Sequence, residues 1–281
     1  MSRYEGRQAV LATKHGKERV IGPALAATAG LRVIVAPEID TDQLGTFTGE
    51  VERPGPAFDV AVAKARLGME RSGLRIGIAS EGSFGPHLAA PFISAGLELI
   101  VCVDDELGIT VHEELLTEVT NAAHLDVRPD DPLDPWLARV GFPEHALIVQ
   151  PRDGQGRAVK GIADRSELRR QIRDAAGASG DGMARIETDL RADRNPTRMR
   201  AIGEVAERLG RRLAATCPSC ASPGFGVEEL IPGLPCGACA WPTDRTLAVR
   251  RSCPHCPYER DEPRPDGRTT ADPGTCARCN P

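Results

Sequence analysis

The chain has 281 residues, of which 41% are hydrophobic but only 4% are aromatic. This length suits one large domain with a small appendage, whose core is built from aliphatic side chains. The formal net charge of -5 argues against a general nucleic-acid binder or a binder of anionic membranes, because such proteins are usually basic.

The sequence predicts a cytoplasmic protein with no membrane partner. It opens with Met-Ser-Arg-Tyr-Glu, and no apolar run approaches the roughly 20 residues that span a bilayer. Cysteines stay reduced in the cytosol, so the nine cysteines of this chain need an explanation other than disulfide bonds.

Short apolar runs alternate with helical patterns in the first part of the chain, which predicts an α/β fold. We expect, in order, a strand over 8–13, a polar turn over 14–17, a helix that ends at Gly30 and a strand over 31–35. We then expect a loop over 38–56, a helix over 57–69, a strand over 74–79, a glycine-rich turn over 81–87, and a hairpin of 97–103 with 109–115.

The alternation continues to about residue 215. We expect a short helix that ends at Val140, a strand over 146–150, a helix over 166–175, a strand over 185–188 and a long helix over 195–215. Composition changes at about residue 216, after which cysteine, proline and glycine dominate. This change predicts an α/β domain over 1–215 and a small Cys-rich domain, similar to zinc ribbons, over 216–281.

Eight of the cysteines form four C-x2-C pairs, a spacing that lets two thiolates meet one metal ion. The ligand candidates are Cys217, Cys220, Cys236, Cys239, Cys253, Cys256, Cys276 and Cys279. Fifteen residues separate the first two pairs and nineteen separate the last two, both suitable for four-cysteine zinc sites. An iron–sulfur cluster uses the same thiolates, but four similar pairs favour two structural zinc ions.

Two pairing orders are open for these cysteines. Consecutive ribbons, in which the first pair joins the second and the third joins the fourth, are the simplest arrangement, and a cross-braced or nested arrangement uses the same residues. Four thiolates leave zinc no open position, so we expect structural sites. The ninth cysteine, Cys102, lies in an apolar strand and is expected to be a core residue.

Charged residues mark a second candidate site in the first domain. Lys17 follows a strand and a turn at a helix start, where backbone amides already favour an anion. Asp59 and Lys64 lie five residues apart on a predicted helix and do not share one face. Glu81 follows a strand, the position where open α/β sheets build sites.

These pieces resemble the inosine/xanthosine triphosphate pyrophosphatase superfamily. Lys14-His15-Gly16-Lys17 is similar to its N-x-x-K motif, with Lys14 in place of Asn. Asp59-Val-Ala-Val-Ala-Lys64-Ala is similar to its E-N-A-x-x-K-A motif, with Val60 in place of Asn. Gly77-Ile78 and Glu81-Gly82 resemble the G-I-E-G-G of one branch, with two extra residues between them.

Thr197-Arg198, near the start of the last helix, resembles the motif at the base side of that superfamily. The whole chain also resembles an uncharacterised bacterial family, including the run Gly-Thr-Phe-Thr-Gly-Glu-Val at 45–51. The first resemblance implies a mixed central sheet flanked by helices in two lobes.

The resemblance also implies an Mg-dependent nucleoside-triphosphate pyrophosphatase. In it, Lys14, Lys17, Lys64, Thr197 and Arg198 would bind the substrate, while Glu81 and Asp59 would hold Mg²⁺ or position water. Glu50 is a spare carboxylate for this role.

Two other functions stay open, a different phosphoryl enzyme and a non-catalytic zinc-ribbon protein that mediates protein or nucleic-acid interaction. Residues 213–281 hold seven arginines against eight acidic residues, so we expect a homodimer or a protein partner for the tail rather than nucleic acid.

Overall fold

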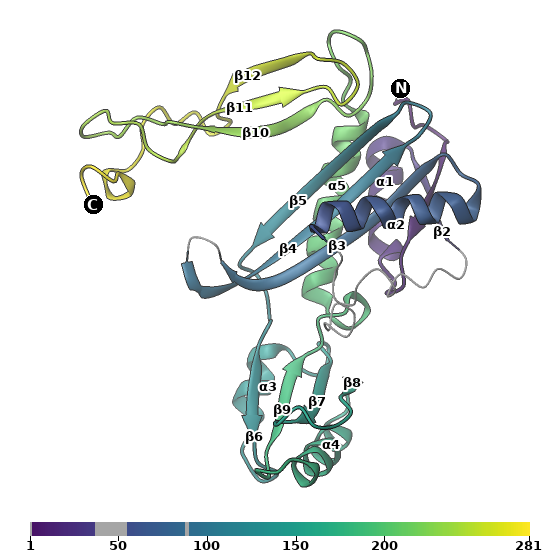
Figure 1. Cartoon of the computed structure of the whole chain (residues 1–281), viewed down its shortest axis with the longest axis vertical. Helices are drawn as coiled ribbons and strands as arrows, with labels where there is room; N and C mark the ends of the chain where they lie inside the picture. The colour runs from purple at the N-terminus through teal and green to yellow at the C-terminus, as the bar shows by residue number, and fades with distance from the viewer. Residues whose placement is uncertain (1, 37–54, 88–89) are drawn as a thin grey trace.

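The structure is a computed structural model that describes residues 2–36, 55–87 and 90–281 (Figure 1). It is a mixed α/β protein with three sheets, which divide the described chain into three parts. We call these the large lobe, built around β1 to β5, the small lobe, built around β6 to β9, and the arm, residues 216–281. The predicted motif at 45–51 and Glu50 lie outside the described residues.

The large lobe is built on a five-stranded sheet with the order β2-β1-β3-β4-β5. Its strands are β1 (Gln8–Ala12), β2 (Arg32–Val35), β3 (Ile76–His87), β4 (Ala90–Asp104) and β5 (Ile109–Thr117). β1 pairs with β2 and β3 in parallel, whereas β3, β4 and β5 form an antiparallel meander. The expected hairpin is therefore present and longer than expected.

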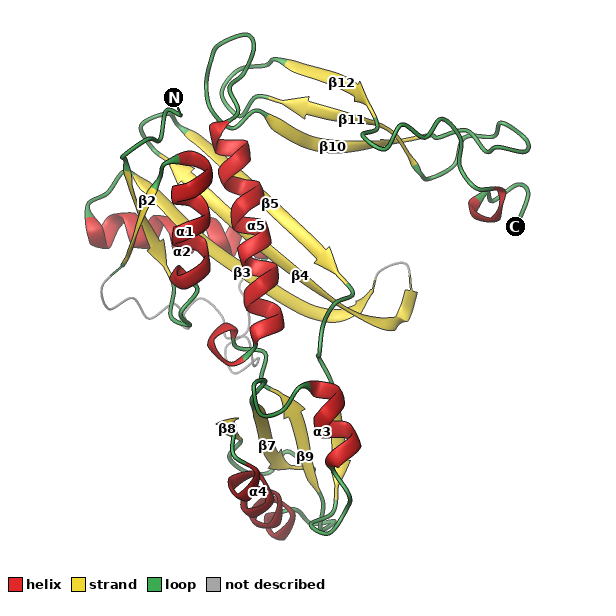
Figure 2. Ribbon diagram, turned by 180° about the vertical axis from the view of Figure 1, so that it is seen from behind, coloured by secondary structure: helices red, strands yellow, loops and turns green. Residues whose placement is uncertain are grey.

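Helices cover both faces of this sheet. α1 (Glu18–Ala29) and α5 (Pro196–Ala214) lie on one face and α2 (Ala57–Ser72) lies on the other (Figure 2). Strand alternation explains the two layers, because Ile78 and Ile100 pack with α1 and α5 while Ala79 and Val101 pack with α2. The core of the large lobe is therefore mainly aliphatic, as the composition predicts.

The helix ends follow local chemistry. Gly30 ends α1 with φ 72°, a left-handed conformation that glycine adopts without a steric cost. Asn195 caps α5 by accepting a hydrogen bond from the backbone N–H of Arg198 at 3.0 Å, and Pro196 takes the first helical position.

The predicted glycine-rich turn at 81–87 is wrong. β3 continues through these residues and pairs with β4 from Ile76 opposite Asp104 to Pro86 opposite Ser94. Glycine and proline are usually unfavourable in a strand, but the long partner strand satisfies the backbone here. Glu81 therefore lies within a strand and not at the end of one.

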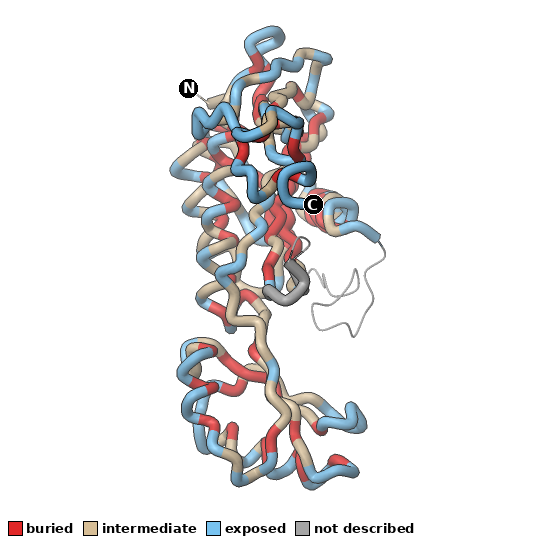
Figure 3. Tube along the Cα trace, turned by 90° about the vertical axis from the view of Figure 1, so that its left-hand side faces the viewer, coloured by how far each residue is buried: buried red, intermediate tan, exposed pale blue. Residues whose placement is uncertain are grey.

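The small lobe has a four-stranded sheet with the order β6-β9-β7-β8. Its elements are β6 (His124–Val127), α3 (Asp134–Val140), β7 (Leu147–Pro151), β8 (Val159–Ile162), α4 (Arg165–Ala178) and β9 (Ala184–Thr188). α3 and α4 pack against one another and against the sheet through Leu137, Ile172, Leu147 and Ile186. The chain crosses between the lobes twice, at 118–123 and at 189–195, where the short helix η2 (Ala192–Arg194) lies (Figure 3).

The arm begins after α5 and carries a three-stranded antiparallel sheet. β10 (Gly226–Pro232), β11 (Thr246–Ser252) and β12 (Glu259–Pro263) form it, and η3 (Pro273–Thr275) precedes the last two cysteines. The arm extends away from the end of the large lobe that lies farther from the small lobe (Figure 1). Within the described residues, no helix combines the length and the apolar character needed to cross a membrane.

Candidate functional site

Among the described residues, unequal strand lengths leave part of one edge of β3 unpaired in the middle of the large sheet. β1 pairs with β3 only as far as Ala12 opposite Ala79, whereas β3 continues to His87. From Ser80 onward, the edge of β3 therefore has no β1 residue beside it. Side chains from both faces of the sheet can approach one another around this edge.

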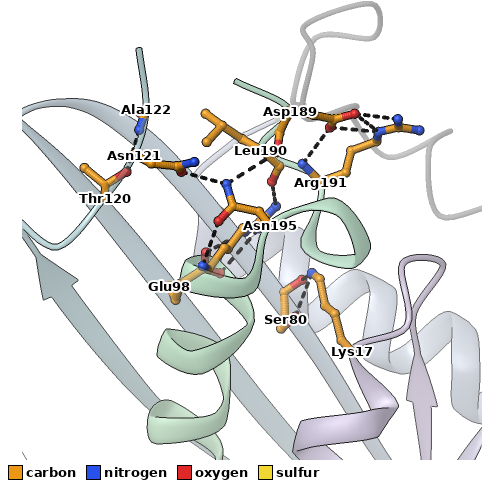
Figure 4. Close-up of polar contacts among 11 residues, drawn as sticks. Lys17, Ser80, Glu98, Thr120, Asn121, Ala122, Asp189, Leu190, Arg191 and Asn195 are labelled. Carbon is orange, nitrogen blue, oxygen red and sulfur yellow. Dashed lines mark hydrogen bonds and ion pairs between the residues drawn. The ribbon is translucent and has the colours of Figure 1, made fainter. Parts of the chain in front are cut away.

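Lys17 lies at this edge. Its ammonium donates hydrogen bonds to the Ser80 hydroxyl at 2.8 Å and to the Ser80 carbonyl at 3.2 Å (Figure 4). Both partners are neutral, and no carboxylate of the described residues forms an ion pair with this ammonium. The β1–α1 loop thus presents a cation whose charge is not neutralised by direct contact.

Two buried ion pairs flank Lys17. On the α2 face, the Lys64 ammonium lies 2.5 Å from a Glu81 carboxylate oxygen. On the face of α1 and α5, Arg198 Nε lies 2.6 Å from Glu98 Oε1, and its Nη1 donates to the Leu190 carbonyl at 2.6 Å. A buried carboxylate needs such a partner because it has lost its hydration.

These five charged residues influence one another. Burial lowers the pKa of Lys17 to about 8, with a further lowering by the positive charges of Arg198 and Lys64. The carboxylates of Glu98 and Glu81 raise that pKa but do not compensate. We call Lys17, Lys64, Glu81, Glu98 and Arg198 the charged cluster, which has three cations and two anions.

Four of the predicted site residues, Lys17, Lys64, Glu81 and Arg198, come together in this cluster, and three others lie elsewhere. Asp59 is exposed in the first turn of α2, and Lys14 is exposed in the β1–α1 loop. Thr197 is half-buried, and its hydroxyl lies 2.9 Å from His145 Nε2 of the small lobe. Among the described residues, carboxylates and histidines form no group of three that would hold a metal ion.

Sequence reasoning missed Glu98, Ser80 and the role of Gly82. A Cβ atom on Gly82 would overlap the Arg198 guanidinium and lie 2.6 Å from the Glu98 carboxylate, so a larger residue there would displace the side chains of this ion pair. A single carboxylate inside the apolar run Leu97-Glu98-Leu99-Ile100-Val101 was the available signal for Glu98.

The interlobe crossing is held by polar contacts next to the charged cluster. Asn195 donates from Nδ2 to the Asn121 side chain at 2.8 Å (Figure 4). Asp189 is fully buried and binds the Arg191 guanidinium through both oxygens, at 3.0 and 2.6 Å. These contacts fix the base of the small lobe relative to α5.

The small lobe also holds a pocket of about 790 Å³. It is lined by Ile148, Gln150, Gly156, Arg157, Ala158, Val159, Lys160 and Glu187. Two cations, one carboxylate and one amide thus share a concave surface, and its size falls within the range of small-molecule sites.

The eight paired cysteines form two separate clusters in the arm. The proximal cluster contains Cys217, Cys220, Cys253 and Cys256, and the distal cluster contains Cys236, Cys239, Cys276 and Cys279. In each cluster the sulfur atoms all lie within 4.8 Å of one another, and the close pairs are 3.7 or 3.8 Å apart. Sulfurs about 2.3 Å from zinc in a tetrahedron are separated by about 3.8 Å, so both clusters are compatible with zinc.

The consecutive pairing order is wrong, and the cross-braced alternative is confirmed. The first cysteine pair joins the third, and the second joins the fourth. The sheet explains this order, because β11 runs antiparallel to β10 and returns the chain from the distal cluster to the proximal one. β12 then carries the chain back toward the distal cluster.

Backbone turns shape the cysteine pairs. The Cys217 sulfur accepts a hydrogen bond from the N–H of Ser219, and the Cys236 sulfur accepts one from that of Ala238, each at 3.4 Å. Ala221 and Ala240, which follow these pairs, have φ near 59°, a strained conformation for alanine. The turns thus aim N–H groups at the thiolates that a metal would bind.

Arg212 joins the proximal cluster to the large lobe. This side chain near the end of α5 is buried and donates to the carbonyls of Gly224 and His112 at 3.2 and 2.9 Å. It also binds Glu228 of β10 at 2.6 Å. Cys102, by contrast, lies in the core of the large lobe, where burial raises the pKa of its thiol.

Comparison with known proteins identifies a family without identifying an activity. No curated protein matches the chain. The family profile covers residues 64–281, which include four members of the charged cluster and both cysteine clusters but not Lys17. The chain therefore belongs to DUF6671, a family described as a domain of unknown function.

Proposed function

We propose that the charged cluster binds the phosphates of a nucleoside triphosphate, and that the protein is a nucleotide pyrophosphohydrolase. The observation that carries this proposal is the Lys17 ammonium, which has only neutral hydrogen-bond partners among the described residues and lies near two further cations. A phosphate beside Lys17 would neutralise this charge and reverse the lowering of its pKa.

The proposed reaction is attack of water on the α-phosphorus, with cleavage of the bond to the bridging oxygen. The products are a nucleoside monophosphate and pyrophosphate. Lys17 would stabilise the charge that develops on the phosphate oxygens, and α1 supplies the positive end of its dipole at the same place. The resemblance to triphosphate pyrophosphatases and their two-lobed fold supports this choice of reaction.

Mg²⁺ would be the expected metal of such a reaction, because it binds one or two carboxylates together with substrate phosphates. Glu81 is suitable as a ligand, although its carboxylate is paired with Lys64 in this structure. Asp59 lies away from the charged cluster, in the first turn of α2, so the remaining ligands of this ion would be substrate phosphate oxygens and water. The metal would supply charge neutralisation of the triphosphate.

The test is pyrophosphate release from a panel of nucleoside triphosphates with Mg²⁺. We expect Lys17→Met to lower kcat/KM for the best substrate by roughly 100-fold or more, because one such charge contact is worth that much in other enzymes. Arg173→Met is a matched control, since Arg173 is an exposed cation on α4 of the small lobe. Absence of release from every triphosphate, or equal rates for Lys17→Met and the native protein, would refute the proposal.

A second candidate function is a non-catalytic protein that acts through the arm. Large apolar side chains are exposed there, namely Leu230, Trp241 and Leu247, and Arg278 stacks over the Trp241 ring at 5.4 Å. A homodimer with the arm at its interface is the partner that we test. A chain that lacks turnover, and that loses self-association on Trp241→Ala in sedimentation velocity, would favour this second function.

A further inference from the structure

The polar residues of the small-lobe pocket are aligned across neighbouring strands of its sheet. Lys160 of β8 and Glu187 of β9 both lie opposite Ile148 of β7, so the three residues form a row across adjacent strands. Gln150 lies two residues further along β7 and therefore points to the same face. The helix-packed face of the same sheet carries Leu147 and Val149 instead.

The row places an apolar surface between two opposite charges. The side chain of Ile148 supplies the floor of the pocket, with Lys160 on one side and Glu187 on the other. Gln150 donates from Nε2 to Glu187 Oε1 at 3.3 Å, which restrains the carboxylate. The flanking strands lie about 10 Å apart, a width that a planar ring with hydrogen bonds at both edges spans.

The polar groups select among planar rings. A carboxylate accepts hydrogen bonds only, so Glu187 favours a ring edge with two adjacent N–H donors. An ammonium donates only, so Lys160 favours a carbonyl or a ring nitrogen on the neighbouring edge. Guanine offers N1–H and the 2-amino group to the first and O6 and N7 to the second, whereas adenine presents an acceptor where guanine has N1–H.

Contacts connect this pocket with the loop that carries Lys17. A Cβ atom on Gly161, next to Lys160, would lie 3.3 Å from Arg191 and 3.7 Å from Arg194. Arg194 pairs with Asp193 at 3.2 Å, and Asp193 lies 3.5 Å from the His15 ring. Gly161 thus lies close to η2, and η2 in turn lies close to the β1–α1 loop.

We propose that the pocket binds the base of a guanine nucleotide, with Glu187 accepting from N1–H and the 2-amino group, and Lys160 donating to O6. Ile148 packs against the flat face of the ring. The inference deepens the proposed function, because it depends on the charged cluster for the phosphates of the same ligand.

The test compares calorimetric affinities of the full chain for non-hydrolysable analogues of GTP and ATP in the presence of Mg²⁺. We expect the GTP analogue to bind roughly 10- to 100-fold more tightly, as hydrogen bonds to a charged group imply. Glu187→Gln, which keeps the size of the side chain, should bring the ratio of the two affinities close to one. Glu144→Gln is the control, because Glu144 is exposed between α3 and β7 and does not line the pocket.

Two further measurements separate the pocket from the phosphate site. Lys17→Met should weaken both analogues by the same factor and leave their ratio unchanged. If triphosphate binding proves independent of Lys17, guanosine and adenosine without phosphates are compared by ligand-observed NMR, in the native chain and in Glu187→Gln. Equal binding of the two bases, a preference for adenine, or a guanine preference that survives Glu187→Gln would overturn the inference.

Discussion

Removing two cysteines at once tests the cross-braced order of the arm directly. In the structure, Cys217 and Cys253 belong to one cluster, whereas Cys217 and Cys236 belong to two. We therefore expect Cys217→Ser with Cys253→Ser to leave one zinc ion per chain. Cys217→Ser with Cys236→Ser should damage both sites and leave less than one.

The magnitude follows from the small core of the arm. The proximal cluster packs with Phe225 as its main buried aromatic residue, and burial of such a side chain contributes about 3 kcal/mol. A structural zinc site contributes an apparent 10–16 kcal/mol at neutral pH. The double variant that loses the proximal site should therefore unfold the adjoining part of the arm, including the end of the sheet where Gly226 pairs with Ser252.

The assay is elemental analysis of purified protein, with X-ray absorption to count the sulfur ligands. The native chain should hold two zinc ions, each with four sulfurs at about 2.3 Å. Cys102→Ser is the matched control, because this cysteine lies in the large lobe and should leave the zinc content unchanged. One zinc ion in the Cys217/Cys236 variant and none in the Cys217/Cys253 variant would refute the cross-braced order.

Three further predictions concern the large lobe. Arg198→Met leaves the buried Glu98 carboxylate without its ion-pair partner. It should lower the free energy of unfolding by about 3–5 kcal/mol in urea titrations followed by circular dichroism, and adding Glu98→Leu should restore most of this loss. Arg212→Met removes the contacts to Gly224 and Glu228, so proteases should cleave the start of the arm faster in limited proteolysis. The zinc content should stay at two ions per chain. An unchanged rate of cleavage would contradict this role of Arg212. Because the pKa of Lys17 is lowered to about 8, its protonated form predominates below that pH and its neutral form above it. Triphosphate affinity should therefore fall by up to about tenfold per pH unit above pH 8, and Lys17→Arg should abolish that fall.

Elements whose own residues follow a clear spacing could be predicted from the sequence alone. In α5, Ile202, Val205, Leu209 and Leu213 recur at helical spacing, and all four are buried in the large lobe. The resemblance to an uncharacterised family is also confirmed, since the family profile covers most of the chain. The cysteine spacing predicted the eight residues that form the two clusters.

Elements that depend on distant partners could not be predicted in this way. The strand continuation through Glu81 and Gly82 is stabilised by their β4 partners Leu99 and Glu98, which lie 18 and 16 positions further along the chain. β12 of the arm is almost entirely charged, and cross-strand ion pairs such as Arg250 with Asp261 take the place of an alternating apolar pattern. Charged strands of this kind resemble loops in a single sequence.

The pairing of cysteines had a different limitation. Both orders place two C-x2-C pairs on each metal, and the lengths of the intervening segments suit either order. The deciding information is the path of β10 and β11 between the clusters, which is a property of the folded sheet. For the charged cluster, the positions of Lys64 and Glu81 in the sequence do not indicate that their side chains form an ion pair on the α2 face.

The cross-braced order also sets a sequence of events during protein synthesis. Once Cys256 has emerged from the ribosome, the proximal site has all four of its ligands, while the distal thiols Cys236 and Cys239 still lack their partners. These two thiols stay available to competing metals and oxidants until Cys279 follows, twenty-three residues later. Maturation of the arm therefore starts at the body of the protein and proceeds outward.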